Sequence, residues 1–568
     1  MKKENFIIVG ITLIIVTISI SLAYFAAKIV GTPKDVDLAM KDLYVEFTDN
    51  TAELNASGIT PGWTYEKTFV VENRSNNIYK YDIIIKDLVN TFVTTDLQYR
   101  ITNTSENGGY SMSNFVSIPK SENVQDVKLA YSVSISMGEK QTYKLELKYV
   151  NSENAQNDDM GKILTGTLFI TEGTEQPTLL SKILEDNPTR STRSNNNNGK
   201  NDFSTSISTD TTGTLFTSTE SITGITDAQK EVYYYAGITT NNWVKFGKYS
   251  SDKIMYRGYE DGVSDYIDYS TLSRCTNASH HNKNCSEYKY WSVGDDIYWR
   301  IIRTNHDSSI RLLYVGSSHD TTVGNIGESP FNTGDNSPKY VGYKYGEDTS
   351  LDTIRNNTTD SVIKTYIDSW YQNNLTDYTK YLSTTAVYCN DRNLGTGQTY
   401  SVKSDVAFAS SNRLDYHNDG ASANPTYNCT DIRDAFSVDN TSAKLDYPIG
   451  LMTADEIAFA GGVPNKDTYN NWYNVNSHFL SVSVSAWWSM TPLASLMGTT
   501  VSDDKIPISH IWDLHSSSTN GFSILSILYP MMEIGVRPVI SLKSCTLYRT
   551  GNGTYSEPYE IDLTSSKC

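Results

Sequence analysis

The chain begins with an uncharged segment that is long enough to cross a membrane. Residues 6–27 carry no charge, with Lys2 and Lys3 before them and Lys28 after them. An α-helix rises about 1.5 Å per residue and a hydrocarbon core is roughly 30 Å thick, so about 20 apolar residues suffice. Lysines before such a segment favour an N-terminus that stays inside the cell. We therefore expect a single-pass helix in the cell membrane, a lipid bilayer as partner, and an extracellular bulk of the chain.

The same segment has a second interpretation, as a cleaved leader. A signal peptide has an apolar region of about 7 to 15 residues and a small-residue cleavage site. Here the apolar run is longer and continues through residues 22–27, which favours its retention as an anchor. Cleavage would release a secreted protein, and both outcomes stay open at this point.

Length and charge narrow the organisation and the partners. A chain of 568 residues exceeds what one hydrophobic core normally covers, so two or three domains are expected. The net charge is -18. An acidic chain repels phosphate backbones, and no basic cluster interleaves with aromatic residues, so nucleic acid is not an expected partner.

The region after the apolar segment alternates in the manner of β-strands. Five short segments, separated by polar turns, fit the alternating template: residues 44–47, 67–73, 80–85, 143–147 and 165–170. Several strands at this spacing predict an all-β, immunoglobulin-like sandwich over residues 32–175. Residues 1–31 are the predicted anchor or uncleaved signal.

Residues 176–230 break this pattern. Leu179, Leu180, Ile183 and Leu184 have the spacing of one short amphipathic helix, which Asn187 and the following proline end. Residues 191–202 are polar and of low complexity, so they predict a flexible spacer. The remaining region, residues 231–568, is the second predicted domain, with both helices and strands.

All six cysteines lie in that second domain and predict disulfide bonds. Their even number and the absence of a C-x-x-C pair favour bridges over a metal site. Six cysteines allow 15 connectivities, of which pairing between sequence neighbours is the simplest. Reduced, buried thiols are the alternative. The expected pairs are Cys275 with Cys285, Cys389 with Cys429, and Cys545 with Cys568.

Three elements of the second domain are expected from local patterns. Residues 298–303 and 310–315 flank a polar tip and predict a β-hairpin whose arginines face solvent. Residues 362–371 repeat apolar side chains at helical spacing after a capping candidate at Asp360, which predicts a core-facing helix. Thr453 and Glu456 form a capping box at the start of another helix. Helix capping accounts for the adjacent acidic residues Asp455 and Glu456, so they need not be catalytic. Separately, Arg537 is expected to be a structural anchor.

Two resemblances to known families follow from particular motifs. Pro61-Gly62 followed by residues 67–73 resembles the camelysin and TasA-like secreted proteins of Gram-positive bacteria. Residues 298–303, 366–371, 450–456 and 535–541, with Trp487-Trp488-Ser489, look like a recurrent C-terminal module of surface proteins of gut Firmicutes. Their order is similar to the C-type-lectin-like fold of the formylglycine-generating-enzyme class. This implies a membrane-anchored surface protein whose residues 231–568 form an α+β lectin-like domain.

Neither resemblance brings a recognisable cofactor site. The enzyme class binds copper through a close cysteine pair, and no pair of this sequence matches it residue by residue. Lectins of the fold bind sugar through calcium, for which Glu260-Asp261-Gly262 to Asp265 or Asp503-Asp504 are candidates, but neither spacing demands calcium. Residues 1–274 contain no His or Cys, the eight histidines form no metal-spaced set, and no catalytic motif is present. We therefore expect no metal, no cofactor and no enzymatic activity.

The best candidate for ligand binding is the stretch from Met490 to Ile534, next to a tryptophan pair. It mixes aromatic residues and histidines with Ser, Thr and Gly, as adaptable recognition surfaces do. An ordinary long insertion is the alternative. The candidate ligand-binding residues are Trp487, Trp488, His510, Trp512, His515 and Tyr529.

These observations together favour a non-enzymatic, adhesin-like bacterial surface protein. Its C-terminal domain is expected to recognise an extracellular glycan or protein ligand. A structural protein of a biofilm matrix is the alternative, and an extracellular oxidase or hydrolase is a further one.

Overall fold

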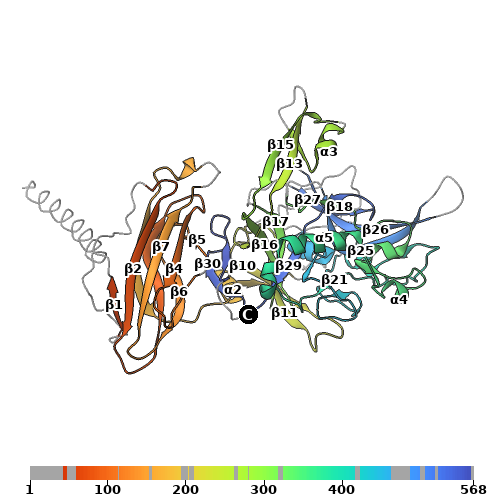
Figure 1. The fold of residues 1–568 in the computed structure, drawn as a ribbon. Helices are drawn as coiled ribbons and strands as arrows, with labels where there is room; N and C mark the ends of the chain where they lie inside the picture. Colours follow the sequence, from red (N-terminus) through yellow and green to blue (C-terminus); the bar gives the residue numbers. More distant parts are fainter. Residues whose placement is uncertain are drawn as a thin grey trace, which may run out of the picture. The chain divides into compact units, whose positions relative to one another are not determined.

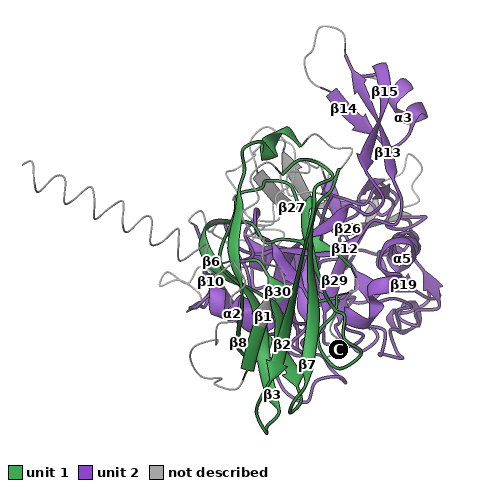
Figure 2. Cartoon of the chain, turned by 60° about the vertical axis from the view of Figure 1, so that its left-hand side comes forward, with its two compact units in different colours: residues 1–177, 549–551, 562–566 green, residues 178–548, 552–561, 567–568 purple. Residues whose placement is uncertain are grey.

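The computed structural model describes most of the chain. The described residues are 43–47, 59–112, 114–151, 156–193, 203, 210–260, 266–278, 280–317, 324–415, 423–461, 486–498, 506–517, 522–563 and 568. They divide into two compact units, shown in Figure 2. Unit 1 consists of residues 1–177, 549–551 and 562–566, and unit 2 of residues 178–548, 552–561 and 567–568.

Unit 1 is a β-sandwich of two antiparallel sheets (Figure 1). One sheet has the order β1-β2-β7-β4-β5 and the other β6-β3-β8. Burial alternates along β2, with Phe69 and Val71 in the core, because successive side chains of a strand point to opposite faces. The strands are β1 (Leu43–Phe47), β2 (Thr64–Asn73), β3 (Tyr79–Asn90), β4 (Leu97–Asn103), β5 (Val116–Ser117), β6 (Ser121–Ile135), β7 (Lys140–Tyr149) and β8 (Leu164–Glu172). The expected sandwich is confirmed, and each of the five expected segments lies in one of these strands.

The largest sheet of unit 2 has ten strands. Its main path runs β24-β29-β17-β16-β11-β10-β9, and β12, β30 and β31 join it at the side. Trp299, Leu312 and Ile540 of this sheet are fully buried in the main core of the unit. The strands are β9 (Thr189–Ser191), β10 (Thr214–Glu220), β11 (Lys230–Tyr234), β12 (Trp243–Lys248), β16 (Asp296–Thr304), β17 (Ile310–Gly316), β24 (Ile449–Gly450), β29 (Val539–Leu542), β30 (Tyr548–Thr550) and β31 (Tyr559–Ile561).

Smaller sheets complete unit 2. A three-stranded sheet has the order β14-β13-β15, and a six-stranded sheet runs β18-β28-β25-β26-β27, with β22 paired to β25. Two pairs, β19 with β20 and β21 with β23, stand alone. Their bounds are β13 (Lys253–Tyr259), β14 (Tyr266–Tyr269), β15 (Lys283–Trp291), β18 (Glu328–Ser329), β19 (Lys344–Tyr345), β20 (Thr359–Asp360), β21 (Tyr388–Cys389), β22 (Val406–Ala407), β23 (Ala435–Phe436), β25 (Ala486–Gly498), β26 (Ile506–Ser517), β27 (Phe522–Leu528) and β28 (Ile534–Gly535).

The helices of unit 2 are short, and all of those described except α6 begin with a side-chain cap. Thr178 caps α2, and Ser361, rather than the expected Asp360, caps α5. The expected capping box of Thr453 and Glu456 begins α7, and Gly461, with a φ of 124°, ends it. The helices are α2 (Leu179–Asp186), α3 (Leu272–Thr276), α4 (Leu351–Ile354), α5 (Val362–Asn374), α6 (Ala409–Arg413) and α7 (Ala454–Ala460).

The fold class expected from the sequence does not agree with the structure. Strands make up 42% of the structure and helices 14%, so it is mostly β-sheet. Among the described residues, no helix is long and apolar enough to cross a membrane. The longest, α5, has 13 residues, and at about 1.5 Å per residue it falls short of a hydrocarbon core of roughly 30 Å. Residues 6–27 lie outside the described residues.

The segment expected to be a linker, residues 176–230, contributes secondary structure to unit 2. It contains α2, β9 and β10, and Leu179 and Ile183 of α2 are buried in the main core. Residues 194–202 and 204–209 of this segment lie outside the described residues.

The expected hairpin is confirmed, but the expected exposure of its arginines is wrong. Strands β16 and β17 pair antiparallel around the polar tip. Arg300, Arg303 and Arg311 are all buried. The hairpin lies in the middle of the large sheet, between β11 and β29, and a strand covered on both faces has no solvent side for alternate residues.

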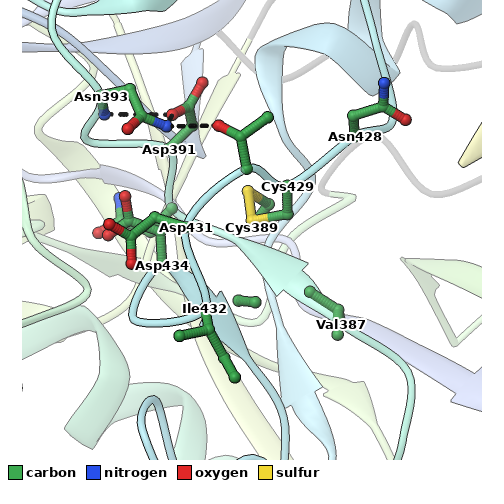
Figure 3. The surroundings of a disulfide bond; sticks show 12 residues. Val387, Cys389, Asp391, Asn393, Asn428, Cys429, Asp431, Ile432 and Asp434 are labelled. Atoms are coloured by element: carbon green, nitrogen blue, oxygen red, sulfur yellow. Dashed lines mark hydrogen bonds between the residues drawn. A yellow bond between two sulfur atoms is a disulfide. The ribbon is translucent and has the colours of Figure 1, made fainter. Parts of the chain in front are cut away.

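The three disulfide bonds join the cysteines that were expected to pair, and no described cysteine is free. Cys275 of α3 lies against β13 at Gly258, where an added Cβ would come within 2.7 Å of the sulfur. Cys389 of β21 is joined to Cys429, as Figure 3 shows. The bonds Cys275–Cys285, Cys389–Cys429 and Cys545–Cys568 span 10, 40 and 23 residues.

We expect the Cys275–Cys285 and Cys389–Cys429 disulfides to stabilise unit 2 unequally. Closing a loop restricts the unfolded chain more when the loop is longer, which corresponds to about 4 kcal/mol for Cys389–Cys429 and about 2.7 kcal/mol for Cys275–Cys285. Replacing each pair by serines and measuring unfolding in urea tests this difference. Equal losses, or a larger loss for the shorter loop, would contradict it.

Candidate functional site

Unit 2 contains an open groove of about 640 Å³ between α5 and the three-stranded sheet. Lys253 at the start of β13 and Trp291 at the end of β15 form one wall. Tyr366 and Trp370 of α5 form the other wall. Ile326 also lines the groove. Pockets of 300 to 1,000 Å³ are the usual size for small ligands.

Helix α5 serves both the core and the groove. Ile363, Ile367 and Tyr371 are buried in the main core. Val362, Tyr366, Trp370 and Asn374 follow one another at intervals of four, so they lie on a neighbouring face, and all four line the groove. Ile363, Ile367 and Tyr371 are therefore core residues, as expected. Tyr366 and Trp370 pack against the core and also line the groove, which was not expected.

The aromatic walls of the groove are held rigidly from behind. The Trp291 ring stacks on Tyr249 with centroids 4.2 Å apart. The Trp370 ring meets Tyr314 edge to face at 5.4 Å and Trp299 at 6.3 Å. Such contacts fix ring orientation as well as adding stability. The indole N–H of Trp370 donates to no acceptor within the described part of the chain.

The rim of the groove is polar and uncharged along α5. Thr365, Ser369 and Asn373 are exposed and recur at intervals of four, so they form one row beside the aromatic residues. The Thr365 hydroxyl donates to the Ser361 carbonyl at 3.2 Å, and the Ser369 hydroxyl to the Thr365 carbonyl at 2.9 Å. Their hydroxyl protons are thereby engaged by the helix, and the oxygens remain free to accept.

Lys253 is the one cation that lines the groove. Its Nζ donates to the Ile326 carbonyl at a long 3.4 Å and lies 5.4 Å from the centroid of the Trp291 ring. Burial lowers the pKa of this lysine from its usual value. No carboxylate among the described residues forms an ion pair with it.

The two carboxylates at the groove already have lysine partners. Asp252 lies 3.0 Å from Lys289, and Asp360 lies 3.0 Å from Lys364 and 3.1 Å from Lys344. The groove therefore carries little uncompensated negative charge.

Lys364 also explains the acidic cluster beneath α5. The carboxylates of Asp360, Asp368 and Asp446 lie close enough together to suggest a cation site. The ammonium of Lys364, which is fully buried, occupies their centre at 3.0, 2.6 and 2.7 Å. A cluster that already holds a lysine cation does not need a metal ion for charge balance.

The calcium candidates of the sequence gain no support from the described residues. Glu260 faces His280 and His281 at 3.5 and 3.8 Å, and residues 261–265 lie outside the described part. Asp503 and Asp504 also lie outside it.

A second concentration of charge lies in the core, around Glu456. Its Oε1 accepts from Arg303 Nε at 2.7 Å and from Arg311, and its Oε2 accepts from the Thr453 amide at 2.9 Å. Arg303 continues to Glu220, 2.9 Å away. Burial alone would raise the pKa of Glu220. The interactions of its carboxylate with Arg303 and His306 outweigh burial and lower the pKa to about 2.

This buried network does not form a binding site for a substrate. The adjoining cavity has a volume of about 20 Å³, which is room for one water molecule. Asp455 is engaged by Arg413 at 2.7 and 2.8 Å through two parallel hydrogen bonds. Near the Cys389–Cys429 bond in Figure 3, Asp434 is likewise engaged by an arginine, Arg392, at 2.7 Å. Asp455 and Glu456 hold structure together, as capping suggested.

Five of the six candidate ligand-binding residues lie on β25 and β26, which pair antiparallel. Trp487 and Trp488 of β25 are fully buried. Trp487 packs under the guanidinium of Arg537 at 4.9 Å, and the Trp488 indole donates to the Ser329 carbonyl at 2.8 Å. Both tryptophans thus belong to the main core of unit 2. Arg537 is fully buried and donates to the Tyr314 carbonyl at 3.0 Å, as expected of an anchor.

The other candidates lie beyond these tryptophans. His510, Trp512 and His515 belong to β26, whose backbone is described and whose side chains are not. Tyr529 follows β27 and is exposed. Of the three candidates whose side chains are described, Trp487, Trp488 and Tyr529, none lines the groove. The sequence feature that points to the groove is on α5, where a hydroxyl residue followed by an aromatic residue occurs twice, four residues apart: Thr365-Tyr366 and Ser369-Trp370.

Comparisons with known proteins identify no family for this chain. No family model matches it, and no curated protein matches it. A structure titled "AvmM Catalyzes Macrocyclization in Alchivemycin A Biosynthesis" is similar over 24% of this chain and 92% of its own, with 12% identity and a TM-score of 0.14. An allantoicase structure is similar over 49% of this chain and 86% of its own, with 10% identity and a TM-score of 0.11.

We expect the stability of unit 2 to depend on pH through Glu220. Its folded pKa of about 2 lies below the ordinary 4.5, so its contribution of about 3 kcal/mol is present above pH 4.5 and is lost as the pH falls toward 2. The variant Glu220→Gln should be less stable by about that amount at pH 7, and the difference should shrink to about 1 kcal/mol at pH 2.5.

Urea unfolding at several pH values measures this difference. Glu347→Gln, at an exposed position of the same unit, is the control and should stay within about 0.5 kcal/mol of the wild type. A difference for Glu220→Gln that does not change with pH would contradict the assignment.

Proposed function

We propose that this chain is a non-enzymatic extracellular binding protein that recognises a glycan in the groove between α5 and β13. The observation that supports this most directly is the pairing of a rigid aromatic wall, Trp291 and Trp370, with a row of hydroxyl and amide groups on the same helix. A surface-exposed, adhesin-like role follows from such recognition.

The chemistry of sugars matches this arrangement. A pyranose ring has an apolar face of C–H groups and a perimeter of hydroxyls. The apolar face packs on aromatic side chains, which contribute large contact areas. Hydroxyls need acceptors and donors at fixed positions, which a few polar groups at the edge of an apolar pocket provide. Thr365 and Ser369 offer acceptors, and Asn373 offers both kinds of group.

The shape of the groove favours a small ligand over a protein surface. Stable protein interfaces bury about 800 Å² on each partner and are comparatively flat. A hollow of about 640 Å³ instead encloses a few linked rings or one extended segment.

The disulfides support an extracellular location. Three bonds among six cysteines form and persist in oxidising surroundings and are rare in the cytosol. The expected bacterial surface location and bilayer partner concern residues outside the described ranges and stay predictions.

Binding of the full chain to a glycan array, followed by titration of the best ligand, tests the proposal. We expect Tyr366→Ala to weaken binding about tenfold, because it removes an aromatic wall whose contact corresponds to about 1.4 kcal/mol. Ser369→Trp, at an exposed rim position, should block the groove without touching the core.

Tyr529→Ala is the matched control, since Tyr529 is an exposed tyrosine outside the groove. Its affinity should equal that of the wild type, and the melting temperatures of all variants show whether they are folded. Loss of binding in Tyr529→Ala with normal binding in both groove variants would place the ligand elsewhere.

A further inference from the structure

We propose that the glycan bound in this groove carries a carboxylate, as a uronic or sialic acid does, and that Lys253 and Tyr366 bind that carboxylate. The inference rests on the proposed function and adds the ligand's chemical class and the residues that select it.

Lys253 has donors to spare at the groove. An ammonium has three N–H donors, and the described residues give it one acceptor, the Ile326 carbonyl at 3.4 Å. Two other lysines of unit 2 have anionic partners: Lys364 contacts three carboxylates, and Lys245 contacts Asp296 and Glu560. Lys253 therefore differs from them in lacking an anionic partner within the described residues.

The position of Lys253 makes an anionic ligand favourable. A lysine that is largely withdrawn from water is destabilised as a cation, and the lowered pKa of Lys253 expresses that cost. A carboxylate arriving in the groove would supply the missing opposite charge at a site where water screens it poorly. Structural lysines usually extend their ammonium to solvent instead.

Tyr366 places a second donor beside the ammonium. Its hydroxyl donates to the Ile326 carbonyl at a long 3.4 Å, so both groups gather around one backbone oxygen. A carboxylate can accept from the ammonium directly, and from the Tyr366 hydroxyl when that proton leaves the Ile326 carbonyl.

Gly327 keeps this corner open. An added Cβ there would lie 2.2 Å from the Tyr366 hydroxyl oxygen and 3.9 Å from Lys253 Nζ. Any side chain at position 327 would therefore displace the hydroxyl from the ammonium. The backbone φ of +142° at this residue also favours glycine.

The carboxylates of the groove do not oppose an anion there. Asp252 and Asp360 are each paired with a lysine, Lys289 and Lys364 respectively. Each of these carboxylates already has a cationic partner, whereas Lys253 has no anionic partner among the described residues.

The test compares acidic glycans with their neutral counterparts. Calorimetric titration of the full chain with an oligogalacturonate and with a sialylated lactose is set against the carboxyl-reduced form of each. We expect at least one acidic form to bind about tenfold more tightly than its reduced form.

Variants at Lys253 assign the preference. Lys253→Met keeps the apolar stem and should bind the acidic and reduced forms equally, whereas Lys253→Arg should retain most of the preference. Lys403→Met, at an exposed lysine away from the groove, is the control and should behave as the wild type. Gly327→Ala should reduce the preference through Tyr366.

The outcomes separate the two proposals. Equal affinity for acidic and reduced forms, or a preference that persists in Lys253→Met, would overturn the carboxylate inference and leave the glycan groove standing. Absence of binding to every acidic and neutral glycan, in a wild-type protein that melts cooperatively, would overturn the proposed function together with the inference.

Discussion

The carboxylate of Glu456 joins parts of unit 2 that are distant in the sequence. It binds Arg303 of β16 and Arg311 of β17, and Arg303 extends the network to Glu220 at the end of β10. These charges are withdrawn from water, so removing one partner leaves the others uncompensated at a cost of about 3 to 5 kcal/mol. The network thereby fixes the hairpin of β16 and β17. That hairpin carries Trp299 and Tyr314, whose rings hold Trp370 at the groove. Rigidity in the core is thus transmitted to the candidate site, where a preorganised wall lowers the entropy lost on binding.

Local patterns in the sequence predicted local structure well. The strands of the sandwich, the hairpin of β16 and β17, the capping box at Thr453 and the disulfide pairs all depend on residues close in sequence or on simple pairing. The exposure of the arginines was not predictable in this way. Whether Arg303 faces solvent or a glutamate 153 residues away depends on which elements cover the sheet, and alternation within one strand carries no such information. The fold class failed for a similar reason, because many short strands of two to four residues escape periodicity.

The candidate site shows the same limit. The sequence predicted Trp487 and Trp488 as ligand-binding residues because they form an aromatic pair. Large aromatic residues are more often buried in the core than exposed to a ligand, and both are fully buried here. The groove needs β13, β15 and α5 together, and α5 begins about 100 residues after the end of β13. The repeat on α5 was visible in the sequence, yet only its packing shows that Ile363 and Ile367 face the core while Tyr366 and Trp370 reach the groove.

Hydrogen exchange of the full chain, with and without a saturating acidic oligosaccharide, tests the central claim most directly. A ligand in the groove should slow exchange of amides in β13 and α5, because it orders the residues that line it. Residues 490–534, the recognition stretch suggested by the sequence, should exchange at unchanged rates. Protection confined to residues 490–534, with β13 and α5 unaffected, would contradict the account.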